Sequence, residues 1–171
     1  AAWDTPHETP PFSEIKLADY EPAFDAAIAC SRAEIEAIVN NPKKPTFGNT
    51  IVALERQGAL LDRISGVFYN LLEAATSDQM QEIALRVQPK LTELSNDVSL
   101  NPELFARVKA VYEKPGRGLS KEDRKLLEDT YQSFARNGAA LSDADKELYR
   151  KYTSELSAAT LQFGQNALAA T

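Results

Sequence analysis

Apolar residues recur at intervals of three and four in six parts of the chain, which is the spacing of one face of an α-helix. No part alternates apolar and polar residues over a length that would predict a strand. Short connections separate the periodic segments, so consecutive helices are expected to be antiparallel neighbours. The pattern predicts an all-α fold, a bundle of about six helices that are mostly antiparallel neighbours. The apolar stripes cover residues 24–39, 51–72, 80–98, 105–112, 126–134 and 148–163.

Residues that favour helix ends lie where these stripes begin or stop. The first helix is expected over Ala18–Asn40, and the second is expected to begin near Thr46 and to continue without a break. Asn101 followed by Pro102 is a typical helix start, because the Asn side chain accepts a backbone N–H and Pro has no N–H to lose. The other expected caps are Thr76 with Gln79, Ser120, and Ser142 with Asp145, and Asn137-Gly138 is the expected stop of the fifth helix.

Prolines divide the chain and disturb two helices. Pro6, Pro10 and Pro11 predict an extended Pro-rich arm over residues 1–16, which leaves 17–171 as the helical domain. Pro22 is expected in the first turn of its helix, where a missing N–H costs nothing. Pro89 lies inside the third stripe and predicts a kink.

The last stripe contains Leu148, Tyr152, Leu156, Ala159 and Phe163, at spacings of 4, 4, 3 and 4. We expect it to be the buried side of the sixth helix, with Phe163 still in contact with the bundle. Leu168 lies further on, and the ending LQFGQNALAAT contains no helix terminator after its last apolar turn. The chain is therefore expected to end on an open helix, which fits either a natural end or a cut.

Composition narrows the class of protein. The chain has 171 residues, of which 43% are apolar and 26% charged, as in ordinary globular domains. A net charge of −6 opposes binding to phosphate backbones, so no nucleic-acid partner is expected. No apolar run approaches the ~20 residues that cross a bilayer, so no membrane partner is expected. A single cysteine needs no oxidising compartment. The cytoplasm is the expected location, and the periplasm stays open because the chain begins Ala1-Ala2-Trp3, without Met.

Two residues, His7 and Cys30, are candidates for a catalytic role, and their sequence context argues against both. His7-Glu8 resembles the start of H-E-x-x-H, but position 11 is Pro, and the motif needs a helix to bring two imidazoles together. One His and one Cys do not supply three zinc ligands. Cys30 lies inside the first helix and has no His nearby in sequence to act as its base. An exposed His and an inert helical Cys are the better interpretations.

Two short motifs have plain structural explanations. Acids at alternate positions in 143–147 resemble a calcium loop, but Leu148 occupies the position that requires Gly. Acids at a helix N-terminus explain them. Residues 115–118 lack the Gly spacing and the Lys of a phosphate-binding loop, and a turn between helices explains them. We therefore assign no catalytic, cofactor-binding or metal-ligating residue to this chain.

Several collinear segments resemble the N-terminal region of the thimet oligopeptidase family of zinc metallopeptidases, and most closely its bacterial peptidyl-dipeptidases and oligopeptidases A. The resemblance covers essentially the whole chain. The segments lie at 10–28, 38–63, 99–113 (SLNPELFARVKAVYE), 134–146 and 155–171.

The resemblance implies a mostly helical enzyme several times longer than this chain, in which two halves flank a channel for short peptides. Zinc on an H-E-x-x-H helix and a downstream Glu lies C-terminal to the matched region, and the motif Glu activates water. The implied role of this chain is a channel-wall domain that restricts substrate access by size, inactive alone. Its implied partners are the catalytic domain of the same polypeptide and short peptides, from which the parent enzyme releases C-terminal dipeptides. The alternative is a free-standing helical interaction module.

Overall fold

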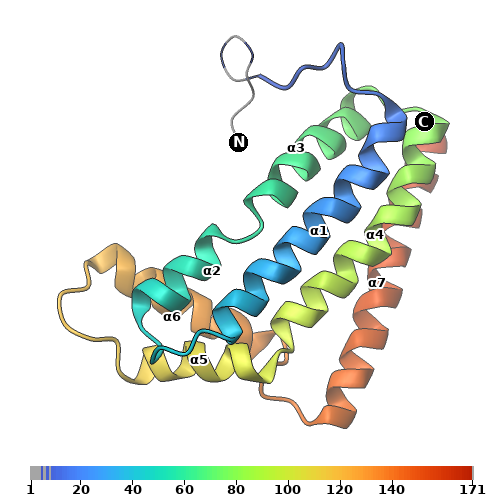
Figure 1. Cartoon of the computed structure of the whole chain (residues 1–171). Coiled ribbons are helices and arrows are strands. Elements are labelled where there is room, and N and C mark those ends of the chain that lie inside the picture. Colours follow the sequence, from blue (N-terminus) through green and yellow to red (C-terminus); the bar gives the residue numbers. More distant parts are fainter. Residues whose placement is uncertain (1–4, 6, 8, 171) are drawn as a thin grey trace.

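Four long helices lie side by side, and shorter helices cross one end of them (Figure 1). The long helices are α1 (Leu17–Val39), α3 (Ala59–Ala74), α4 (Asp78–Ser99) and α7 (Asp143–Ala169). The shorter ones are the π-helix η2 (Phe47–Ile51), α2 (Val52–Arg56), α5 (Pro102–Glu113) and α6 (Lys121–Arg136). The computed structural model describes residues 5, 7 and 9–170, and these contain no strand. The predicted all-α class is confirmed.

Chain direction alternates from α1 to α3 to α4 to α7, so consecutive long helices are antiparallel (Figure 1). Helix α4 packs against α1 on one side and against α7 on the other. Residues 9–16 form a turn at 12–14 and no helix, while Trp3, Pro6 and Glu8 lie outside the described residues. The division into an arm and a helical domain stays a prediction.

Two separate cores are both built on α1. Near its start, Phe24 is fully buried and meets Phe68 of α3 edge to face, with ring centroids 5.5 Å apart. Near its end, Ile35 and Ile38 pack against buried residues of the crossing helices. The first core consists of Tyr20, Phe24, Phe68, Met80, Ile83, Ala84 and Val87. The second consists of Ile35, Ile38, Ile51, Leu104, Val108, Val111, Leu127, Phe134 and Ala139.

The second predicted helix is broken at Gly58, so the prediction of one continuous helix is wrong. Gly58 has φ 76°, a left-handed conformation that interrupts a right-handed helix and suits glycine. Two polar side chains of α1 form hydrogen bonds with residues at the break. Glu34 Oε2 accepts a hydrogen bond from the Gly58 N–H at 2.8 Å, and Ser31 Oγ donates to Gln57 Oε1 at 2.9 Å. The break lets η2 enter the second core while α3 enters the first.

Three predicted caps are confirmed, and one is displaced. The side chains of Asn101, Ser120 and Ser142 each accept a backbone N–H of the first turn that follows. Helix α4 is capped by Ser77, which accepts from the Met80 N–H at 3.3 Å, because the helix begins one residue later than predicted. Thr76 instead accepts a hydrogen bond from the side chain of Gln81.

Both helical prolines lie in the interior of a helix, Pro22 in α1 and Pro89 in α4. Helix α1 begins at Leu17, so Pro22 lies beyond its first turn, contrary to the prediction, and removes one intrahelical hydrogen bond. Helix α4 continues through Pro89. The kink at Pro89 stays a prediction.

Gly138, after α6, is the glycine whose replacement the structure opposes most directly. It has φ 89°, and a Cβ there would lie 2.9 Å from Leu141 Cδ1 and 3.1 Å from Leu100 Cδ2. Gly138→Ala is expected to lower the free energy of unfolding by about 1–3 kcal/mol, measured by urea denaturation.

Gly164→Ala is the matched control, because Gly164 lies inside α7 and a Cβ added there would have no neighbouring atom within 4 Å. It is expected to raise stability by up to about 1 kcal/mol, since Ala is the better helix former. Equal effects of the two substitutions would contradict this account of Gly138.

Candidate functional site

The two residues considered as catalytic candidates, His7 and Cys30, both lie at the surface of the protein. The Cys30 thiol lies 3.7 Å from a Glu34 carboxylate oxygen. Across residues 5, 7 and 9–170, no group of three or more His, Cys, Asp or Glu side chains is placed to hold a metal ion. Glu8, the second residue of the His-Glu pair, lies outside the described residues.

The two short motifs have the structural roles expected of them. Asp143 and Asp145 lie in the first turn of α7, where their charges favour the helix N-terminus. Gly116 and Gly118 take φ values of 81° and 86° in the connection between α5 and α6.

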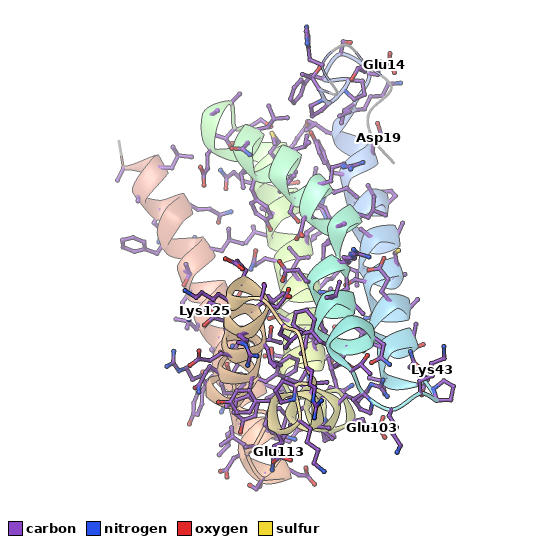
Figure 2. All side chains as sticks on the ribbon, turned by 90° about the vertical axis from the view of Figure 1, so that its left-hand side faces the viewer. Glu14, Asp19, Lys43, Glu103, Glu113 and Lys125 are labelled. Atoms are coloured by element: carbon purple, nitrogen blue, oxygen red, sulfur yellow. The ribbon has the colours of Figure 1, made fainter. Side chains whose placement is uncertain are left out.

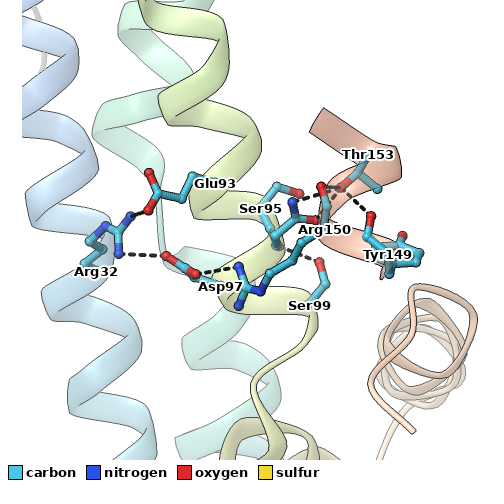
Figure 3. A network of polar contacts seen from close by, with 9 residues as sticks. Arg32, Glu93, Ser95, Asp97, Ser99, Tyr149, Arg150 and Thr153 are labelled. Carbon is cyan, nitrogen blue, oxygen red and sulfur yellow. Dashed lines mark hydrogen bonds and ion pairs between the residues drawn. The ribbon is translucent and has the colours of Figure 1, made fainter. Parts of the chain in front are cut away.

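Helix α7 is attached to the bundle by a polar seam, which we define as its hydrogen bonds and ion pairs with α4 (Figure 3). At one end of the seam, Asp97 of α4 forms ion pairs with two arginines. Its Oδ1 pairs with Arg150 Nη1 of α7 at 2.9 Å, and its Oδ2 pairs with Arg32 Nη1 of α1 at 2.7 Å. One carboxylate therefore links three helices.

The seam continues along α4 through uncharged side chains. Asn96 is buried, and its amide nitrogen donates to Thr153 Oγ1 at 2.9 Å. Further along, Gln88 Nε2 donates to Ser157 Oγ at 3.0 Å, and Thr92 Oγ1 lies 2.8 Å from the same hydroxyl. Tyr69 OH of α3 donates to Gln88 Oε1 at 2.9 Å, and burial raises the pKa of Tyr69, which keeps this donor protonated.

The predicted buried stripe of the last helix faces solvent instead, which corrects the sequence analysis. Leu156 is 67% exposed and Phe163 is 75% exposed, and Leu148 and Tyr152 are also exposed. No described residue of α7 is buried. In Figure 2, α7 (red) stands at one edge of the molecule. The orientation follows from the polar seam, because Thr153 and Ser157 lie on a different face of α7 from the stripe.

A groove with a volume of about 560 Å³ runs between α3, α4 and the second half of α7. Its walls combine aliphatic and aromatic carbon with amide and hydroxyl groups and the carboxylate of Glu73. The side-chain nitrogen of Gln165 is buried beside it and has no hydrogen-bond partner among the described residues. The lining includes Tyr69, Leu72, Gln88, Leu161, Gln165 and Leu168.

Known proteins similar to this chain include several bacterial peptidases. Dipeptidyl carboxypeptidase of Escherichia coli is 43% identical over 166 residues, which are 96% of this chain and 24% of the relative. The chain is homologous to the N-terminal quarter of this peptidase. Dipeptidyl carboxypeptidase of Salmonella typhimurium is 42% identical over the same shares of both chains. Oligopeptidase A of Haemophilus influenzae is 28% identical over 95% of this chain and 24% of its own length.

The homology confirms the resemblance to the thimet oligopeptidase family. The chain spans about a quarter of the length of these relatives. No family model matches it. Among the described residues, no helix is long and apolar enough to span a membrane.

The sequence analysis missed two features of α7, the polar seam and the outward orientation of its apolar stripe. The sequence did contain one signal of the seam: the polar residues Gln88, Thr92 and Asn96 recur at intervals of four, which places them on one face of α4.

Replacing Asp97 tests whether the seam holds α7. Asp97→Ala leaves Arg32 and Arg150 without their shared partner, and we expect the free energy of unfolding to fall by about 1–2 kcal/mol. The estimate is modest because Asp97 is 32% exposed. The loss should shrink in about 1 M salt, which screens the ion pairs of the intact protein.

Asp129→Ala is the control, because Asp129 pairs with Lys125 on the exposed face of α6. We expect it to change stability by less than about 0.5 kcal/mol in urea denaturation. If the two alanine variants were equally stable, Asp97 would contribute no more to stability than the surface ion pair of Asp129 does.

Proposed function

We propose that this chain is the N-terminal helical region of a zinc metallopeptidase that releases dipeptides from the C-termini of short peptides. The observation that carries the proposal is the 43% identity to a dipeptidyl carboxypeptidase over 96% of the chain. Identity to an oligopeptidase A is lower, at 28% over a similar span. The difference favours dipeptide release over internal cleavage.

The donor set of this chain does not fit the zinc of such an enzyme. The chain has one His and one Cys, and the described residues place no cluster of three potential ligands together. A catalytic zinc site needs three protein ligands and an open position. In the proposed enzyme, the ligands and the base that activates water therefore come from polypeptide outside these 171 residues.

The role that we propose for this region is to form part of the wall of the substrate channel. Two buried cores on one long helix make a firm support, which a barrier against folded proteins requires. The groove between α3, α4 and α7 supplies apolar surface and amide groups along a helical wall. An extended peptide has both kinds of group to match, whereas a folded domain is too large to enter a groove of about 560 Å³.

The test uses the uninterrupted reading frame that contains this chain, expressed as one polypeptide. We expect zinc-dependent release of dipeptides from a peptide of about ten residues, identified by mass spectrometry. A peptide with an amidated C-terminus should be cleaved more slowly, because the enzyme is proposed to recognise the terminal carboxylate. The 171-residue chain alone should release nothing and hold no stoichiometric zinc after dialysis.

Three results would contradict the proposal. Cleavage at internal bonds, equal for free and amidated peptides, would indicate an oligopeptidase of the other type. Chelator-sensitive turnover by the 171-residue chain would show that it holds its own site. A reading frame without further coding sequence would leave the chain as a separate helical module.

A further inference from the structure

The outward face of α7 has the composition of an interface and not of a solvent-exposed helix. We name the outer stripe by its residues Leu148, Tyr152, Leu156, Ala159 and Phe163. Four of these are large apolar or aromatic side chains that are 49–75% exposed. From Leu156 to Ala170 the chain contains no Asp, Glu, Lys or Arg, although 26% of all its residues are charged.

These two properties together distinguish the outer stripe from scattered surface hydrophobics, which are normal. Interfaces are depleted in charged residues at their centre and enriched in aromatic ones. Aromatic and aliphatic side chains that fill a partner's pockets supply most of the affinity. Tyr152, Leu156 and Phe163 have this character, and their spacing places them on one side of the helix.

We infer that the outer stripe is the docking surface for the polypeptide that continues after residue 171, and that a helix of that continuation covers it. The inference rests on the proposed function, because it requires a longer chain. The relatives supply the length, since this chain spans 24% of dipeptidyl carboxypeptidase of E. coli.

Position and spacing favour this occupant. The outer stripe runs along α7, the last helix described, so a segment that follows residue 171 starts beside it. Consecutive elements joined by short connections usually pack together, and the long helices of this chain that follow one another run antiparallel. Intervals of 4, 4, 3 and 4 present a ridge that fits the groove of another helix.

A second copy of the chain fits the outer stripe less well. Stable interfaces bury about 800 Å² on each partner, and five side chains of one helix, one of them an alanine, offer less than that. An intramolecular segment avoids most of the entropy lost when two separate molecules associate. The same small surface is therefore sufficient within one chain.

The experiment compares one substitution in two lengths of polypeptide. Leu156→Asp places a charge at the centre of the outer stripe. In the 171-residue chain we expect its unfolding temperature to change by no more than about 2 °C, because Leu156 is 67% exposed. In the polypeptide translated from the uninterrupted reading frame, we expect the first unfolding transition to fall by about 5 °C or more.

Gln162→Asp is the matched control. Gln162 is exposed, lies in the same uncharged half of α7, and carries a polar side chain at the margin of the outer stripe, three residues after Ala159. We expect it to change the unfolding temperature of either polypeptide by no more than about 2 °C. A change at Leu156 that Gln162 does not share is then a property of the surface and not of added charge.

Four results would overturn the inference. Leu156→Asp that destabilises the short chain would mean that the outer stripe packs within it. Leu156→Asp without effect on the long polypeptide would mean that nothing docks there. A dimer of the short chain that Leu156→Asp dissociates would identify a second copy as the occupant. A reading frame that stops at residue 171 would remove the occupant.

Dipeptide release by the unsubstituted long polypeptide separates this inference from the proposed function. If dipeptides are released and Leu156→Asp has no effect, the docking surface is wrong and the enzyme assignment stands. If Leu156→Asp destabilises an inactive long polypeptide, the docking surface stands and the enzyme assignment is wrong.

Discussion

Phe24 and Ile38 lie near opposite ends of α1, and each belongs to a different core. Helix α1 must therefore keep one face buried over both cores, apolar except for Ser31 between them, and the other helices take their places from it. Burial of a large apolar side chain contributes about 1.5–3 kcal/mol, so each core is worth far more than any surface ion pair. The break at Gly58 fits this arrangement, because Ile51 before it packs into the second core and Phe68 after it packs into the first.

Helix α7 is held by a different kind of interaction, and the functional proposals follow from that difference. Its contacts with α4 include a series of hydrogen bonds and an ion pair, each of which replaces water by a protein partner at a net gain of about 1 kcal/mol, and of its apolar residues Leu161 packs against the first core. Its apolar stripe makes no comparable contribution within this chain. A long helix that is hydrogen-bonded to the bundle on one face and exposes apolar side chains on another lacks a packing partner for its exposed face. Such a helix is expected where further polypeptide packs against it, and the dipeptidyl carboxypeptidase of E. coli, of which this chain spans 24%, contains such further polypeptide.

The sequence was sufficient for the helices, because periodic apolar residues and caps such as Asn101 and Ser120 act locally. It was not sufficient for the break at Gly58, since a glycine within a periodic pattern does not reveal whether its φ is positive. It was also misleading for α7. Apolar periodicity predicts that Leu156 and Phe163 face the bundle, but periodicity shows only that two residues share a face. Which partner covers the face depends on helices elsewhere in the chain, or beyond it. The polar residues of α4 that fix the orientation carry no apolar signal.

Hydrogen exchange of α7 tests the central claim, that this helix is completed by polypeptide beyond residue 171. In the dilute 171-residue chain, amides of Leu148–Phe163 should exchange much faster than those of Phe24–Ile38 in α1, because α7 has no buried residue among those described. In the polypeptide expressed from the uninterrupted reading frame, the α7 amides should slow to the rates of α1, while α1 changes little. Equal protection of α7 and α1 in the short chain at low concentration would contradict the claim.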